Sequence, residues 1–190
     1  MRCARFVSSA VLLLLLAGCG SGKVDWADPE NLLYREQAAE KDGFVELEYW
    51  SLLDAPCQKI YDALAAVEEY PTFIPGVDSV SVVATTTSSK TVQIAQRVIG
   101  RQTSAKVEWT FDPEKLRIDF RTLSSDLTYN DGFYQLEKSP DDTRCLVRSK
   151  FLSKQGKGLS AGAVSQATRE SFMSAARAVR KRAGADASAG

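Results

Sequence analysis

The sequence predicts an α+β domain built on an antiparallel sheet of seven strands, with two short helices after the first strand and a long helix at the C-terminus. Three patterns lead to this prediction. Segments in which apolar and polar residues alternate follow one another through the middle of the chain, most of them separated by turn signals. A helical segment punctuated by prolines interrupts them near residue 54, and a long helical period lies near the end of the chain.

The expected strands have a period of two. In the first, Phe44–Leu53, apolar residues at 45, 47 and 49 alternate with glutamates at 46 and 48, which is typical of a half-buried strand. The others are expected at Val77–Ala84, Thr91–Ile99, Ala105–Phe111, Leu116–Thr122, Phe133–Leu136 and Thr143–Leu152. Most are joined by short turns such as Asp112-Pro113-Glu114-Lys115, and consecutive hairpins produce an antiparallel sheet.

Two short helices are expected between the first two strands. Asp54 can cap the first, and Pro56 fits its first turn, where a backbone N–H is not needed. The apolar face of this helix has residues spaced three and four apart, namely Ile60, Tyr61 and Leu64. Prolines at 71 and 75 break the following turn and leave a group of large apolar side chains, Tyr70, Phe73 and Ile74.

The C-terminal helix is expected over Ser160–Arg182, with two contrasting faces. The charged face, which should be solvated, contains Arg169, Glu170, Arg177, Arg180 and Lys181. The opposite face carries mostly small residues: Ala161, Val164, Thr168, Ser171, Phe172, Ala175, Ala178 and Val179. Where this face covers a curved sheet, its small residues allow either close helix–sheet packing or an internal cavity.

A resemblance to a known family rests on the segment around the two short helices. The residues that carry it are Ala55-Pro56, Ile60-Tyr61, Leu64, Tyr70-Pro71, Phe73-Ile74-Pro75 and Val77. This motif resembles the START-like (SRPBCC) superfamily, closest to its coenzyme-Q-binding and polyketide-cyclase-like branch, over roughly Phe44 to Arg182. The resemblance implies a helix-grip fold around a hydrophobic cavity and favours the cavity over close packing. It implies less about function, because the family holds lipid carriers, cyclases and interaction modules.

Residues 1–18 resemble a bacterial lipoprotein signal peptide. Arg2 and Arg5 precede an apolar stretch, Phe6–Leu16, that is too short to span a bilayer as a mature helix. Leu16-Ala17-Gly18-Cys19 resembles a lipobox, which implies cleavage before Cys19 and a diacylglycerol on its thiol. The alternative is an ordinary signal peptide with an incidental cysteine. We therefore expect a lipid-anchored, periplasm-facing envelope protein, and Gly20 in place of an aspartate favours the outer membrane.

The mature chain is expected to hold one domain. Residues 19–43 should form a tether and a short helix that begins at Asp28-Pro29 and ends at Gly43, followed by the START-like domain over 44–183 and a disordered tail over 184–190. Loss of two arginines with the signal peptide leaves 22 basic against 24 acidic residues, a net charge of −2. A chain with this net charge has no excess of basic residues with which to bind nucleic acid. We also expect the protein to be a monomer.

Two cysteines remain once Cys3 leaves with the signal peptide and Cys19 is lipidated. In a helix-grip sheet the first strand pairs with the last, which would bring Cys57 and Cys145 together. A disulfide between them suits an oxidising compartment, and two buried free thiols are the alternative.

Motifs for chemistry are scarce. The sequence contains no histidine, the commonest general base and a usual zinc ligand. It also has no cysteine cluster with metal-ligand spacing and no phosphate-binding glycine loop. The adjacent carboxylates Glu68-Glu69 and Asp141-Asp142 are expected in turns or helix ends. We therefore predict no catalytic residue, no metal and no cofactor.

The favoured function is binding of a hydrophobic small molecule, such as a lipid, a quinone or a polyketide-like ring system, for transport or sequestration. The residues expected to bind it are Ile60, Leu64, Tyr70, Phe73, Trp109, Val164, Thr168, Ser171 and Ala175. Tyr129 is a further aromatic candidate. Arg97 or Arg121 would hold an anionic head group if either points inward, which strand alternation does not decide.

Two alternative functions remain open. One is a cyclase- or aromatase-like enzyme, against which the missing histidine and the membrane tether both argue. The other is an envelope interaction module with a filled core and no ligand.

Overall fold

The computed structural model describes residues 24–41, 43–98, 101–126, 129–154 and 160–185. The predicted lipidation site, Cys19, and the side chain of Tyr129 lie outside the described residues.

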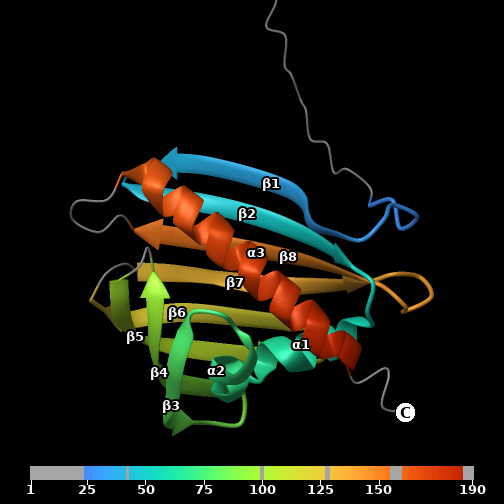
Figure 1. Ribbon diagram of the computed structural model, residues 1–190. Coiled ribbons are helices and arrows are strands. Elements are labelled where there is room, and N and C mark those ends of the chain that lie inside the picture. The colour runs from blue at the N-terminus through green and yellow to red at the C-terminus, as the bar shows by residue number, and fades with distance from the viewer. Residues whose placement is uncertain (1–23, 42, 99–100, 127–128, 155–159, 186–190) are drawn as a thin grey trace, which may run out of the picture.

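Within these ranges the chain forms an eight-stranded antiparallel sheet with a long helix across one face (Figure 1). The strands are β1 (Asn31–Lys41), β2 (Phe44–Leu53), β3 (Val77–Thr85), β4 (Ser89–Val98), β5 (Arg101–Asp112), β6 (Arg117–Ser125), β7 (Tyr129–Lys138) and β8 (Cys145–Lys154). Their spatial order is β1-β2-β8-β7-β6-β5-β4-β3. The helices are α1 (Cys57–Ala65), α2 (Tyr70–Phe73) and α3 (Ala161–Ala185), with a 3-10 turn, η1, at Val67–Glu69. This arrangement confirms the helix-grip fold.

The strand β1 corrects the prediction of a helix between Asp28 and Gly43. Asn31–Lys41 pairs antiparallel with β2 and makes the sheet eight strands wide rather than seven. Backbone pairing along the open edge of β2 overrides the helix-favouring composition of this segment. Side chains add to the pairing, because the Arg35 guanidinium stacks on the Trp50 ring, 4.1 Å from its centroid. Gly43 takes a left-handed φ of 77° between the two strands, a conformation that glycine adopts without strain.

Two predicted helix ends are also corrected. Asp54 does not cap α1: the cap position is Pro56 and no side chain caps the helix. Because Pro56 is extended and occupies the cap position, Asp54 lies two residues before it. Asp54 instead accepts a hydrogen bond from Arg144 Nε at 2.6 Å. Helix α3 runs to Ala185, into the predicted tail, because Ala183 is buried in the core. No helix within the described ranges is both long and apolar enough to cross a membrane.

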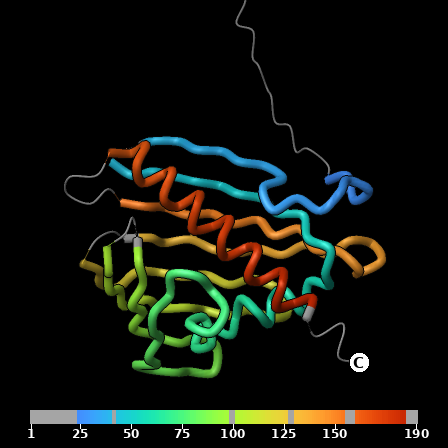
Figure 2. The backbone as a smooth tube through the Cα atoms, in the orientation of Figure 1, coloured from blue at the N-terminus to red at the C-terminus, as the bar shows by residue number. Residues whose placement is uncertain are grey.

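Helix α3 crosses the inner face of the sheet diagonally, from the end where β8 finishes to the end that carries α1 (Figure 2). The inward positions of β2 are 45, 47 and 49, as the alternation predicts, and all three side chains are buried. Tyr49 stacks on Phe172 of α3 with ring centroids 4.7 Å apart, which fixes the middle of the helix over β2. Besides β2, helix α3 contacts β1, α1 and α2.

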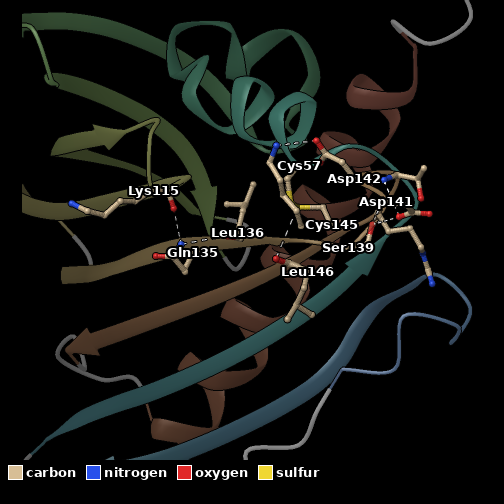
Figure 3. Close-up of a disulfide and its surroundings, with 12 residues drawn as sticks. Cys57, Lys115, Gln135, Leu136, Ser139, Asp141, Asp142, Cys145 and Leu146 are labelled. Atoms are coloured by element: carbon tan, nitrogen blue, oxygen red, sulfur yellow. Dashed lines mark hydrogen bonds and ion pairs between the residues drawn. A yellow bond between two sulfur atoms is a disulfide. The ribbon is translucent and has the colours of Figure 1, made fainter.

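Cys57, the first residue of α1, forms a disulfide with Cys145, the first residue of β8 (Figure 3). Of the two alternatives for these thiols, the structure has the bridge, and both residues are fully buried. It fastens α1 to the end of the central strands. All strands and helices of the described structure lie within residues 31–185, so a chain that begins at Gly20 retains the whole domain and its core.

Tyr49 gives the first prediction, because its buried hydroxyl has no hydrogen-bond partner among the described residues. Burial, with Glu36 nearby, raises the pKa of Tyr49 to about 12. The folded tyrosine therefore stays protonated while the unfolded one ionises above pH ~10, so stability falls between pH 10 and 12 by up to about 2 kcal/mol from this group. Tyr49→Phe should leave stability at pH 7 unchanged or higher, and should flatten this alkaline decline in urea unfolding. A variant that declines as steeply as the wild type would contradict the assignment to Tyr49.

Candidate functional site

A cavity of about 280 Å³ lies between the inner face of the sheet and α3. Helix α1 closes one end through Ile60 and Leu64, and the connection from α2 to β3 borders one side. The helix leaves this space because the residues it turns towards the sheet are short, with Ala167, Ser171 and Ala175 in the lining.

Much of the cavity wall is aromatic. Trp109, Phe120 and Phe151 form a continuous run across β5, β6 and β8, with ring centroids 5.3 Å apart for the first pair and 5.7 Å for the second. The aromatic lining continues with Tyr134 on β7, Tyr70 on α2 and Phe172 on α3. The rings of Phe120 and Phe151 meet across the intervening strand because the residue between them on β7 is Gly132.

A second part of the wall is polar and uncharged. It lies where β6 and β8 end and β7 begins, at the end of the sheet where α3 starts. Here Ser153 Oγ bonds Asn130 Oδ1 at 3.0 Å, and Thr122 Oγ1 donates to the Asn130 carbonyl at 2.8 Å. These hydroxyls are therefore already engaged within the protein.

The cavity opens to solvent between α3 and the α2–β3 connection. Ser171 on the helix and Pro75 and Gly76 on the connection all line it and are all exposed. Arg97 of β4 stands at this opening with its side chain 69% exposed and its Nε 3.5 Å from Asp78 Oδ2.

Most of the residues predicted to bind ligand lie on this wall. Those among the lining residues are Ile60, Leu64, Tyr70, Trp109, Val164, Thr168, Ser171 and Ala175. Phe73 is not in the lining: its ring packs edge-on against Tyr70, 5.7 Å between centroids, and beneath the Arg182 guanidinium. Arg121 is also outside, paired with Glu108 at 2.8 Å, so of the two candidate arginines only Arg97 reaches the cavity, at its opening.

The polar residues of the strands were not predicted as site residues. Ser149 and Ser153 share the parity of Val147 and Phe151 in β8, so the apolar members of that strand mark the inward face. The alternation in the sequence therefore shows which residues of β8 point inward. It does not show which of them line a cavity, because that depends on where α3 crosses the sheet.

The lining offers little for acid–base catalysis. The described residues that form it include no carboxylate and no lysine, and the chain has no histidine. Burial raises the pKa of Tyr70 well above its ordinary value, and burial likewise raises the pKa of Tyr134, so both phenols are neutral at physiological pH. In the described part of the chain, no three potential metal ligands gather. The arrangement suits binding rather than proton transfer.

Comparison with known proteins agrees with this geometry. The family model described as "Polyketide cyclase / dehydrase and lipid transport" matches residues 53–175. No curated protein matches the chain in sequence.

Solved structures share the fold. The Zhui aromatase/cyclase from Streptomyces sp. R1128 is similar with a TM-score of 0.64 and 18% identity, over 74% of this chain and 94% of that one. A START superfamily protein from Mycobacterium smegmatis gives 0.65 and 12% over 73% and 97%. A STAR-related lipid transfer protein from Xanthomonas axonopodis gives 0.58 and 12% over 78% and 98%.

Proposed function

We propose, because the chain belongs to the polyketide cyclase/dehydrase and lipid transport family, that it binds a hydrophobic small molecule beneath α3 and carries or sequesters it at the bacterial cell envelope. The observation that carries this proposal is the cavity itself, lined by aromatic and aliphatic side chains and open at one side. Burial of apolar ligand surface there would contribute on the order of 25 cal/mol per Å², before the costs of association.

The size of the cavity limits the cargo. About 280 Å³ corresponds to roughly nine water molecules at bulk density. That space suits a small ring system or one short chain, and it is at the lower end of ligand pockets in proteins. A lipid with two full acyl chains would need a larger cavity, so we favour a ring compound or a single-chain lipid as the cargo.

The anchor proposed at Cys19 would hold the domain close to the membrane. The first described residue, Val24, follows Cys19 by five positions, which span at most about 18 Å. The segment that follows Val24 is held against the domain, because Arg144 Nη1 donates to the carbonyl of Asp28 at 2.6 Å and also to that of Trp26. A domain held this near would collect an apolar ligand from the membrane surface rather than by diffusion through water.

Mass spectrometry of the chain purified from its native envelope tests both parts of this proposal. Native spectra of the domain beginning at Gly20, loaded with envelope lipid extract, should contain one ligand per chain, and denaturation should release it for identification. The mature full-length chain should begin at Cys19 and carry the added mass of a diacylglycerol. A domain that takes up nothing from the extract would favour the interaction-module alternative, and an unmodified N-terminus would remove the anchor.

Ala175→Trp gives a direct test of the binding site. Ala175 lines the cavity from α3, so the indole should occupy the ligand volume, and uptake in the native spectrum should fall to background. Ala163→Trp is the matched control, because Ala163 lies on the same helix, is exposed and does not line the cavity. Unchanged uptake by a folded Ala175→Trp protein would place the ligand elsewhere.

A further inference from the structure

We infer that the ligand is a neutral compound that carries at least one hydrogen-bond-accepting oxygen and places it deep in the cavity. This inference rests on the proposed function and narrows its ligand class. It excludes pure hydrocarbons and compounds with an ionised group inside the protein.

Two polar atoms of the cavity wall carry the inference. Trp109 Nε1 on β5 and Ser149 Oγ on β8 are both buried, and no described residue gives either a hydrogen bond. Trp109 is 6% exposed and Ser149 is 0% exposed. An indole N–H is a donor only, so the group that satisfies Trp109 must be an acceptor, and a hydroxyl such as Ser149 accepts or donates.

The other buried hydroxyls of the wall show that these two atoms are exceptions. Ser51 Oγ donates to the Leu32 carbonyl at 2.7 Å, and Ser153 and Thr122 bond with Asn130. Buried polar groups in proteins are nearly always paired, and an unpaired one costs stability. Trp109 and Ser149 both belong to the lining of the cavity, so a ligand bound there is the candidate for the missing partner of either atom.

The charges around the cavity argue for a neutral ligand. Among the described lining residues the only ionised side chain is Arg97, which stands at the opening, is largely exposed and faces Asp78. Tyr70 and Tyr134 are neutral, so nothing inside would compensate a carboxylate or an ammonium group. An ionised group buried without a partner is strongly unfavourable.

The separation between Trp109 and Ser149 determines how long a ligand must be to bond with both of them. Strands β6 and β7 separate β5 from β8, so these two strands are about 14 Å apart across the sheet. The register places Phe151 level with Trp109, and Ser149 lies two residues further along β8. A small ring compound therefore reaches one of the two atoms, while a longer ligand with oxygens at both ends reaches both.

Three probes with one bicyclic skeleton test the inference: tetralin, the ketone α-tetralone and tetralin-2-carboxylate. Binding is measured by calorimetry on the oxidised domain that begins at Gly20. We expect α-tetralone to bind about 5- to 100-fold more tightly than tetralin, and the carboxylate to bind more weakly than the ketone. The double variant Trp109→Phe/Ser149→Ala should reduce the ketone preference to about one, and the two single variants show which atom the ketone uses.

Tyr49→Phe is the matched control, because it removes an unpaired buried hydroxyl that does not line the cavity. It should keep the ketone preference. The ratio of two affinities in the same variant is the readout, so a general loss of packing does not imitate the expected result. Equal binding of ketone and hydrocarbon, a preference that survives the double variant, or tightest binding of the carboxylate would overturn the inference. If none of the three probes binds and the domain also takes up nothing from envelope lipid extract, the proposed function itself fails; uptake from the extract without binding of α-tetralone overturns this inference alone.

Discussion

Replacing both Cys57 and Cys145 by alanine is expected to lower the free energy of unfolding by roughly 2–5 kcal/mol. The disulfide joins residues 88 positions apart, so it removes a large loop from the unfolded ensemble. It also fastens the first turn of α1 to the first residue of β8, and α1 supplies Ile60 and Leu64 to the cavity wall. Loss of the bridge should therefore weaken ligand uptake as well as stability.

Urea unfolding of the oxidised wild type, the reduced wild type and the double variant measures this effect. The reduced protein and the double variant should unfold at similar, lower urea concentrations, and a reducing agent should not affect the double variant further. Because Cys57 and Cys145 are both 0% exposed, reduction must be carried out on unfolded protein before refolding. A double variant within about 1 kcal/mol of the oxidised wild type would show that the bridge contributes little.

The strands were predictable because their inward residues are apolar over several alternations. Phe44–Leu53 is recovered with the same bounds, and the other predicted strands overlap β3 to β8 with ends shifted by a few residues. The largest difference is at β7, expected only over Phe133–Leu136 but running from Tyr129 to Lys138. The strand pattern is weakened there by Asn130, Asp131 and Gly132. The same segment makes polar contacts in the cavity wall and allows the aromatic rings on the neighbouring strands to approach each other.

The strand β1 was missed for a different reason. Its sequence favours a helix locally, and only pairing with β2 makes it a strand. One sequence signal does oppose the helix: Asp-Gly at 42 and 43 is a strong hairpin dipeptide between two segments of similar length. The Gly43 φ of 77° fits that signal.

The candidate site likewise contains residues that the sequence predicts and residues that it does not. The small residues of α3 follow from helical periodicity, which is why Val164, Thr168, Ser171 and Ala175 could be proposed as a group. The unpaired Trp109 and Ser149 atoms could not, because a missing hydrogen bond depends on the neighbours that strand order and register bring together. The same holds for Arg97, whose place at the opening depends on the α2–β3 connection.

Gly132→Ala is expected to destabilise the domain by roughly 3 kcal/mol, because the site has no room for a methyl group. A Cβ at this position would lie 1.9 Å from the backbone oxygen of Lys150 and 2.8 Å from Phe120 Cζ. The carbonyl belongs to the paired strand β8 and cannot move without separating β7 from β8. Phe120 could move only by leaving Phe151, with which it forms the aromatic wall of the cavity.

Gly162→Ala supplies the comparison that separates this clash from a general effect of replacing glycine. Gly162 lies in the first turn of α3, and a Cβ there meets nothing within 4 Å, so alanine should stabilise the helix by about 0.5–1 kcal/mol. Urea unfolding should thus shift in opposite directions for the two variants. Equal, small shifts would mean that β7 and β8 relax easily around residue 132. In that case the aromatic wall could widen to admit a ligand larger than the 280 Å³ cavity, because Phe120 and Phe151 would be free to part.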